Sequence, residues 1–319
     1  MRLYNNSYMW YPLHMRTLVD ILTPYDSIAI AGMAKNAGKT TALNYMINGF
    51  SPQGRTLGLT SIGLDGEETD QVTATPKPRI HVPQGTIIAT AEQLLTKRER
   101  GINDITREIL AVTDITTPLG RIVVARALSA GAVMLAGPSM VSQIVPIMGI
   151  LQDWGASKII IDGAVGRKSL AVPEIAQAVV LATGASLARD INAVIAETKH
   201  TADIFELPLA GAALCNPFPE EYVHIQGAIT DTKLDALNKK HIIADDATKI
   251  LITPKALAKL RLSGGTLSVK KRINLAAITI NPISPYGINF DAADFLEKMK
   301  QVINIPIFNI VWATSCRPY

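Results

Sequence analysis

The stretch that decides the fold expected for this chain is Ser27-Ile28-Ala29-Ile30-Ala31-Gly32-Met33-Ala34-Lys35-Asn36-Ala37-Gly38-Lys39-Thr40-Thr41. Its apolar first part predicts a buried strand. Residues 42–47 predict a helix with one apolar face, and Gly49 predicts the end of that helix. A strand, a loop of small residues that ends in Gly-Lys-Thr, and a helix form the context that a phosphate-binding P-loop requires. The alternative is an ordinary glycine-containing turn between a strand and a helix.

The chemistry of a phosphate site explains the residue types in this loop. Small residues let backbone N–H groups turn around an anion, and the helix N-terminus adds a partial positive charge. Lys39 is expected to reach the β- and γ-phosphates of a nucleotide, and the Thr40 hydroxyl to bind Mg²⁺. The strict pattern GxxxxGK[ST] places glycine at position 33, whereas this chain has Met33 there and Gly32 one place earlier. The residues expected to bind the nucleotide are Lys35, Asn36, Ala37, Gly38, Lys39, Thr40 and Thr41.

Two aspartates are candidates for the metal and for catalysis beside Lys39. Residues 158–161 predict a buried strand that ends at Asp162, which is typical of the Walker-B strand that delivers one carboxylate to the metal. An apolar run before an aspartate also occurs by chance in many α/β proteins. Asp65 follows the strand expected at 55–61, where P-loop proteins of the nitrogenase-iron-protein-like class place a carboxylate. The alternative for Asp65 is a turn, because Asp-Gly favours turns.

Composition excludes several classes of protein. The 319 residues are 48% hydrophobic and 18% charged, as in a well-packed globular protein. Aromatic residues make up 5%, too few for base-stacking platforms, and the net charge of +4 is spread along the chain, so we expect no nucleic-acid partner.

Residues 127–152 carry no charge, but Gly137-Pro138 divides them into a strand and a helix, so we expect no membrane span. Two distant cysteines and no apparent signal peptide indicate the cytoplasm.

The order of strand and helix signals predicts an α/β fold. We expect a P-loop NTPase-like, mostly parallel sheet with helices on both faces, and a smaller C-terminal α/β module. The predicted domains are an N-terminal arm at 1–25, a nucleotide-binding domain at 26–203 and a smaller domain at 204–319. Several strands follow one another too closely for helices between them and predict an antiparallel annex. Further strands and helices are expected at 79–82, 86–89, 109–112, 121–125, 132–136, 140–154, 178–183, 186–197, 223–229, 233–237, 241–244, 249–252, 256–262, 275–280, 290–299 and 305–311.

Other polar residues carry weaker predictions. Thr232-Lys233-Leu234-Asp235 matches the [NT]KxD motif that reads guanine, but it opens an expected helix, where Asp231 or Thr232 would serve as an N-cap. Arg167 and Lys168 follow the Asp162 strand and would pair with phosphate or with an acidic partner, or lie in solvent. The histidines are scattered and show no metal-ligand spacing.

Several stretches resemble the P-loop reactivase subunit that accompanies lysine 5,6-aminomutase, within the broader nitrogenase-iron-protein-like P-loop NTPases. The resemblance covers most of residues 26–190. It includes the loop at 32–41 and Leu135-Ala136-Gly137-Pro138-Ser139, and Lys35 is similar to the extra lysine of the broader class, one position nearer to Lys39. The other similar stretches are 58–67, 86–92 and 162–169.

The resemblance implies a slow, Mg²⁺-dependent ATPase that acts as a chaperone. Such a protein would use ATP to expel inactivated cobalamin from an adenosylcobalamin-dependent aminomutase, with residues 61–70 as the nucleotide-sensitive switch. Its implied partners are the mutase and a second reactivase subunit, and a homodimer is implied by analogy with related P-loop proteins. One alternative is a small-molecule kinase or an ATP-dependent ligase resembling dethiobiotin synthetase. A second is a nucleotide-binding scaffold that never hydrolyses; ATP versus GTP stays open.

Overall fold

A nine-stranded sheet forms the centre of the structure, a computed structural model that describes residues 16–63, 79–96, 105–165, 175–210, 222–237 and 241–311. The seven strands from β16 to β4 are parallel, while β6 is antiparallel to both of its neighbours. The expected α/β class with a mostly parallel sheet is therefore confirmed. The strands, in spatial order, are β16 (Ile307–Asn309), β15 (Leu275–Asn281), β9 (Ala178–Gly184), β1 (Ser27–Gly32), β8 (Lys158–Val165), β2 (Leu57–Ser61), β4 (Ile87–Ala91), β6 (Gly120–Ala127) and β5 (Arg107–Thr117).

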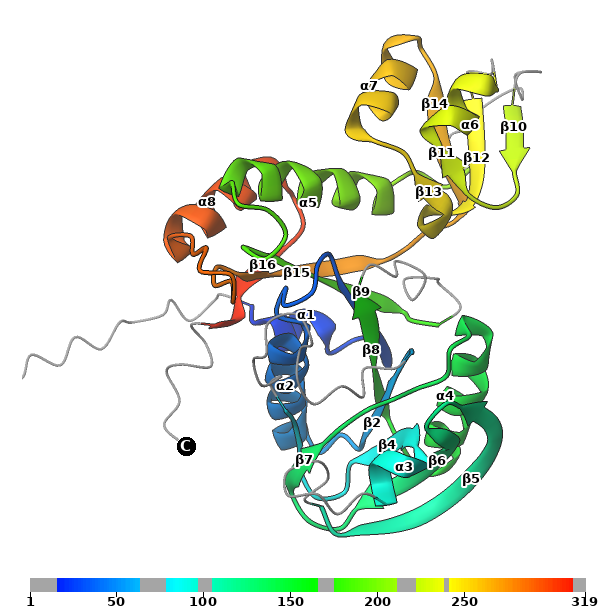
Figure 1. Ribbon diagram of the computed structural model, residues 1–319, viewed down its shortest axis with the longest axis vertical. Coiled ribbons are helices and arrows are strands. Elements are labelled where there is room, and N and C mark those ends of the chain that lie inside the picture. Colours follow the sequence, from blue (N-terminus) through cyan, green and yellow to red (C-terminus); the bar gives the residue numbers. More distant parts are fainter. Residues whose placement is uncertain are drawn as a thin grey trace, which may run out of the picture.

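Helices cover both faces of this sheet. Helices α1 (Leu18–Leu22) and α2 (Lys39–Phe50) pack on the face that carries Ile28 and Ile30 of β1. Helix α4 (Ile144–Asp153) packs on the opposite face with Ala29, and Figure 1 shows α2 and α4 on opposite sides of β2 and β8. The remaining elements of this part are α3 (Glu92–Thr96), α5 (Ile191–Phe205), α8 (Ala292–Val302) and the antiparallel pair β3 (Ile80–Val82) and β7 (Gly131–Val133).

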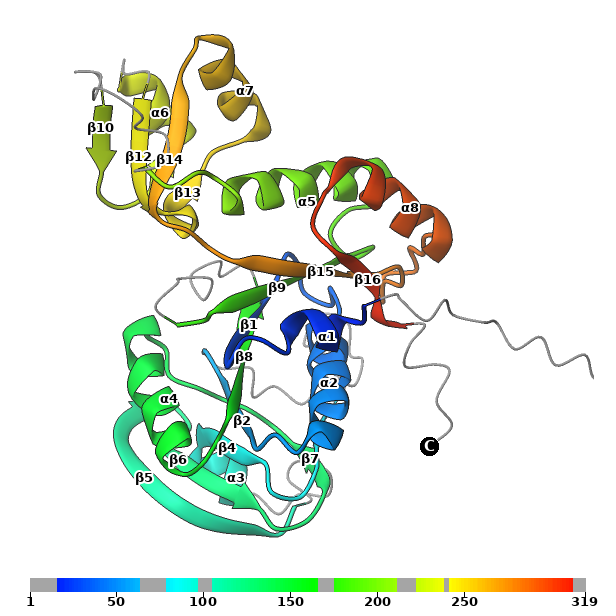
Figure 2. The same cartoon turned by 180° about the vertical axis from the view of Figure 1, so that it is seen from behind.

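A smaller unit is inserted into the chain between α5 and β15. Its three-stranded parallel sheet has the order β10-β12-β14, and two short helices lie beside it (Figure 2). Its elements are β10 (Tyr222–Ile225), β11 (Ile229–Thr230), α6 (Asp231–Ala236), β12 (His241–Asp246), β13 (Ile250–Leu251), α7 (Pro254–Leu262) and β14 (Thr266–Lys271).

The sheet assignment of two strands differs from the expectation. β15 and β16 belong to the stretch expected to form the smaller C-terminal module, but they extend the large sheet beyond β9. The cause is long-range pairing of β15 with β9, which local periodicity does not reveal. The expected antiparallel annex is in part a continuation of the same sheet, because β6 pairs directly with β4.

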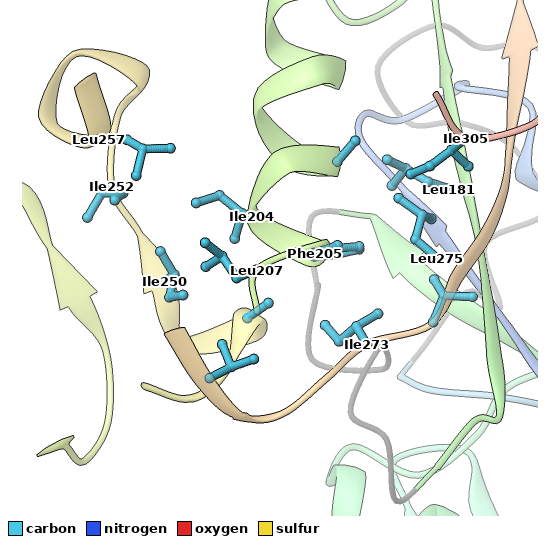
Figure 3. Close-up of a cluster of buried hydrophobic side chains, with 14 of the residues drawn as sticks. Leu181, Ile204, Phe205, Leu207, Ile250, Ile252, Leu257, Ile273, Leu275 and Ile305 are labelled. Atoms are coloured by element: carbon cyan, nitrogen blue, oxygen red, sulfur yellow. The ribbon is translucent and has the colours of Figure 1, made fainter. Parts of the chain in front are cut away.

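One apolar core joins the small sheet to the large one. Figure 3 shows its side chains running from Leu257 of α7, past Ile204 and Phe205 at the end of α5, to Leu181 of β9 and Leu275 of β15. The C-terminal end of α5 therefore packs against both sheets.

Two helix boundaries differ from the expectation, the end of α2 and the start of α5. Gly49 does not end α2, which continues to Phe50; a Cβ at Gly49 would lie 2.3 Å from a methyl carbon of Val19, so this glycine permits close packing of α1 on α2. α5 begins at Ile191 and not at 186, because Asp190 caps the helix by accepting a hydrogen bond from the Ala193 amide.

Among the described helices, none is both long and apolar enough to cross a membrane.

Candidate functional site

The candidate site lies where neighbouring parallel strands end. β1 ends at Gly32, β2 at Ser61, β9 at Gly184 and β15 at Asn281, and Asp162 of β8 pairs in register with Ser61. In open α/β sheets, ligands bind beyond the carboxyl ends of the strands. The loop between β1 and α2 lies at this edge.

The side chain of Lys39 packs over Gly32, and this contact explains why the glycine of the loop stands at position 32 and not at 33. The side chain of Lys39 is 8% exposed, and its stem crosses Gly32, where an added Cβ would lie 2.7 Å from Cδ of Lys39. The Lys39 ammonium donates a hydrogen bond to the carbonyl oxygen of Gly163, the residue after Asp162. A side chain at position 32 would therefore displace the lysine from Gly163 of β8.

The loop turns into α2 through left-handed backbone conformations. Asn36 has φ +62° and Gly38, the N-cap of α2, has φ +93°. No side chain caps the helix at Gly38, and the first turn of any helix leaves its N–H groups without helical acceptors. These N–H groups and the helix dipole suit an anion.

Asn281 supports this loop from β15, and sequence reasoning missed it. Its Nδ2 donates a hydrogen bond to the carbonyl oxygen of Asn36 at 3.2 Å. Asn281 fits between two glycines, because a Cβ at Gly38 would lie 3.1 Å from Cβ of Asn281, and a Cβ at Gly184 would lie 2.2 Å from its carbonyl oxygen. The only sequence signal was an asparagine at the end of an expected strand, and the pairing that brings β15 to the site is long-range.

Asp162 and Ser61 lie on the face of the sheet that α2 covers. Ile160 of β8 and Leu59 of β2 pack in the cluster that contains α2, and residues two positions apart on a strand share a face. Asp162 is 5% exposed, and its carbonyl oxygen accepts a hydrogen bond from the Ile62 amide at 3.0 Å. The predicted carboxylate thus lies in the strand beside β1 and next to the residue that Lys39 contacts. The strand does not end at Asp162 as expected, because pairing of Val165 with Gly32 of β1 extends β8 to Val165.

The segment 136–138 fixes the end of β2. The Gly63 amide donates to the Pro138 carbonyl oxygen at 2.8 Å, and the Gly137 amide donates to the Gly63 carbonyl oxygen at 3.3 Å. A Cβ at Gly137 would lie 1.6 Å from the carbonyl oxygen of Ser61, so only glycine allows this approach. Nearby, Thr90 of β4 accepts a hydrogen bond from the Ala136 amide at 2.9 Å.

Part of the predicted site lies outside the described residues. Asp65, Arg167 and Lys168 are among these, as is most of the switch expected at 61–70. Within the described residues, Lys39, Asp162 and the loop from Lys35 to Thr41 come together at one edge of the sheet, with Thr40 in the first turn of α2.

The guanine-like motif has local partners in the smaller unit. Thr230, not Thr232, caps α6, and Lys233 donates hydrogen bonds to two backbone carbonyl oxygens of residues 226 and 228. Asp235 forms an ion pair with Lys259 at 2.6 Å. Asp231 accepts hydrogen bonds from the Thr253 amide and hydroxyl, and these bonds hold the pKa of Asp231 below its ordinary value. The contacts of Asp231 and of the motif residue Asp235 hold α6 against Thr253 and Lys259 of the α7 segment.

Among the residues that the structure describes, the remaining polar clusters do not form a metal site. On the small sheet, His224 contacts Asp245 at 2.8 Å and Lys270 at 3.2 Å. In the described ranges, no group of three histidine, cysteine, aspartate or glutamate residues is arranged to hold a metal ion.

The chain matches no family model, no curated protein and no solved structure.

The residues present fit a hydrated Mg²⁺ beside a phosphate. Mg²⁺ prefers oxygen ligands and keeps several of its waters. The oxygen ligands available at this edge are the Asp162 carboxylate and, in the first turn of α2, the Thr40 hydroxyl. The lysine held over Gly32 supplies a positive charge for phosphate oxygens. The arrangement is suited to binding a polyphosphate together with a divalent cation.

Proposed function

We propose that this chain is a Mg²⁺-dependent ATP-binding P-loop protein. The observation that carries the proposal is the position of Lys39: its stem crosses Gly32, and its ammonium contacts Gly163 of β8, the residue after Asp162. In this reading, the loop from Lys35 to Thr41 binds the phosphates. Thr40 and Asp162 hold the cation, which would neutralise phosphate charge when bound.

Each residue has a specific task in this proposal. The first-turn N–H groups of α2 donate to phosphate oxygens, and Lys39 turns from the Gly163 carbonyl oxygen to the β- and γ-phosphates. Asn281 keeps the loop in its turned shape through the Asn36 carbonyl oxygen. Asp65 is the residue proposed to position the attacking water, as a second carboxylate of the site.

We further propose that slow hydrolysis serves a protein partner, namely an adenosylcobalamin-dependent aminomutase that the chain reactivates as a chaperone, together with a second reactivase subunit. The support is the resemblance that covers most of residues 26–190 and the contact of residues 137–138 with the end of β2. Contact at that point would couple the nucleotide site to the segment after Ser61. A homodimer and a location in the cytoplasm belong to the same proposal.

The test compares nucleotide binding by wild type, Lys39→Ala and Lys39→Met. Methionine keeps the apolar stem over Gly32 and removes only the charge, so folding should persist. We expect ATP affinity to fall by about 10- to 100-fold in both variants, the range for lost charge-assisted hydrogen bonds. Lys298→Met, which removes a surface lysine of α8 paired with Asp294, is the control. Unchanged affinity in Lys39→Met would refute the proposal.

Turnover measurements separate the proposed chaperone from its alternatives. Stimulation of ATP hydrolysis by a purified adenosylcobalamin-dependent aminomutase supports the reactivase. Stimulation by a small metabolite supports a kinase or a ligase resembling dethiobiotin synthetase. Tight ATP binding without turnover supports a non-hydrolysing scaffold.

A further inference from the structure

The Ser61 hydroxyl is a buried polar group at the candidate site. The side chain of Ser61 is 1% exposed, and its Oγ has no hydrogen-bond partner within the described part of the chain. Leaving a buried hydroxyl without a partner is unfavourable, and such groups in native proteins usually meet a water, an ion or a ligand. Two other hydroxyls share this property, those of Ser186 and Thr279, but neither is paired in register with Asp162.

Its position beside Asp162 indicates what the hydroxyl would contact. Ser61 and Asp162 are register partners in the parallel β2–β8 pair, and neighbouring strands are about 4.8 Å apart. Both side chains lie on the face that α2 covers, the face from which the Lys39 stem crosses Gly32. A group bound at the Asp162 carboxylate is therefore within reach of the Ser61 hydroxyl.

The backbone around Ser61 is held on two sides. Its carbonyl group is packed against Gly137, and the next residue, Ile62, donates its amide proton to the Asp162 carbonyl oxygen. The backbone that carries the hydroxyl is thus fixed in position before any ligand binds, which reduces the entropy lost on binding.

We propose that Ser61 is a positioning residue for the divalent cation: its hydroxyl hydrogen-bonds to a water of the Mg²⁺ hydration shell, next to the Asp162 carboxylate that holds the cation. A hydroxyl suits this task because it both donates and accepts, and because Mg²⁺ retains most of its water. This inference rests on the proposed function, since it assigns a further residue to the same Mg²⁺–ATP site. It adds a contact that explains why a serine, and not an apolar residue, ends β2.

The experiment measures Mg²⁺ dependence, not turnover. ATP binding is followed by calorimetry at fixed ATP over a MgCl₂ series and in EDTA, for wild type and Ser61→Ala. The Mg²⁺ concentration for half-saturation should rise about three- to tenfold in Ser61→Ala, the range for one hydrogen bond. Binding in EDTA should not change. Without nucleotide, Ser61→Ala should melt at the same temperature as wild type or higher, because the variant no longer buries an unpartnered hydroxyl.

Thr60→Val is the matched control. Thr60 is the adjacent residue in β2, also buried, but its side chain lies on the opposite face of the sheet, and its hydroxyl donates to the Ala89 carbonyl oxygen at 3.2 Å. Thr60→Val should lower the melting temperature and leave the Mg²⁺ requirement unchanged.

The outcomes distinguish this inference from the proposed function. If wild type binds ATP with a Mg²⁺ requirement and Ser61→Ala has the same requirement, the role of Ser61 is refuted and the proposed function stands. If wild type and Lys39→Met bind ATP equally weakly, or not at all, both are refuted. A lower melting temperature for Ser61→Ala without nucleotide would also count against the inference, since it would indicate a structural hydrogen bond.

Discussion

A single glycine accounts for the departure of this loop from the strict P-loop pattern. The pattern expects glycine at position 33, but the stem of Lys39 crosses the backbone at Gly32. Met33 is instead free to carry a side chain, which packs against the core that joins the two sheets. The position of the lysine thus decides which residue has to lack a Cβ.

Gly32→Ala should weaken ATP binding more than it weakens the fold. The new methyl carbon would lie 2.7 Å from Cδ of Lys39, so the lysine stem must move and its ammonium leaves the Gly163 carbonyl oxygen. We expect an affinity loss of about tenfold and a loss of unfolding free energy of about 1 kcal/mol. Calorimetric titration with MgATP and chemical denaturation measure the two effects.

The control for Gly32→Ala is Gly149→Ala on α4. A Cβ at Gly149 would meet no atom within 4 Å, so this variant should keep full affinity and gain slightly in helix stability. Equal affinities for Gly32→Ala and Gly149→Ala would show that the lysine stem does not depend on Gly32.

At the scale of elements, a buried lysine attaches α1 to the sheet. Lys158, the first residue of β8, is fully buried, and its ammonium donates hydrogen bonds to the carbonyl oxygens of Leu22, Thr23 and Tyr25 at the end of α1. It also lies 4.6 Å from the centre of the Phe50 ring. Lys158 thus joins α1, α2 and β8 at the sheet edge opposite the candidate site.

Burial of this lysine predicts a dependence of stability on pH. Burial, and next the charge of Arg55, lower the pKa of Lys158, while Asp26 opposes the shift. In the unfolded chain Lys158 keeps the ordinary lysine pKa of 10.5. At pH values between the lowered pKa and 10.5, the unfolded chain therefore binds a proton that the folded chain has lost. The contribution of Lys158 to the unfolding free energy consequently increases as pH rises through this range. Lys158→Met should cost about 1–3 kcal/mol at neutral pH, because three carbonyl oxygens lose their donor.

The difference in unfolding free energy between wild type and Lys158→Met should therefore widen from neutral pH towards pH 10.5. Urea denaturation of both proteins across this range measures the difference, in which the titration of other residues cancels. A difference that narrows as pH rises would contradict the lowered pKa.

Sequence patterns predicted most of the local elements and only part of the site. The apolar runs of β1, β8 and β9 were recognised because central parallel strands are buried on both faces. Gly49 was misread as a helix end, since its reason is the approach of Val19 from another element. Asn281 was missed for the same reason: what places it at the site is strand pairing, which a single sequence does not display. Ser61 was included in the expected switch, but its register pairing with Asp162 was not predicted.

At the scale of the whole molecule, the inserted unit and the large sheet share one core. The chain leaves the large sheet through α5, forms the three-stranded sheet and returns as β15, so that Phe205 and Ile204 contact apolar side chains of both parts. A sequence read from one end to the other suggested that the large domain was complete before the smaller one began. The return of the chain to pair with β9 supplies Asn281, and with it a contact to the loop that precedes α2.

Phe205→Ala should weaken both sheets together. Phe205 is fully buried where the two parts meet, and truncation of such a side chain costs about 3–5 kcal/mol. Because the core is continuous, hydrogen exchange of the slowest amides in both β12 and β15 should become faster by comparable factors. Met46→Ala, in the separate core beneath α2, is the comparison: it should affect β15 more than β12. Faster exchange in β12 alone for Phe205→Ala would mean that the small sheet unfolds independently, and the shared core would then not couple the two parts.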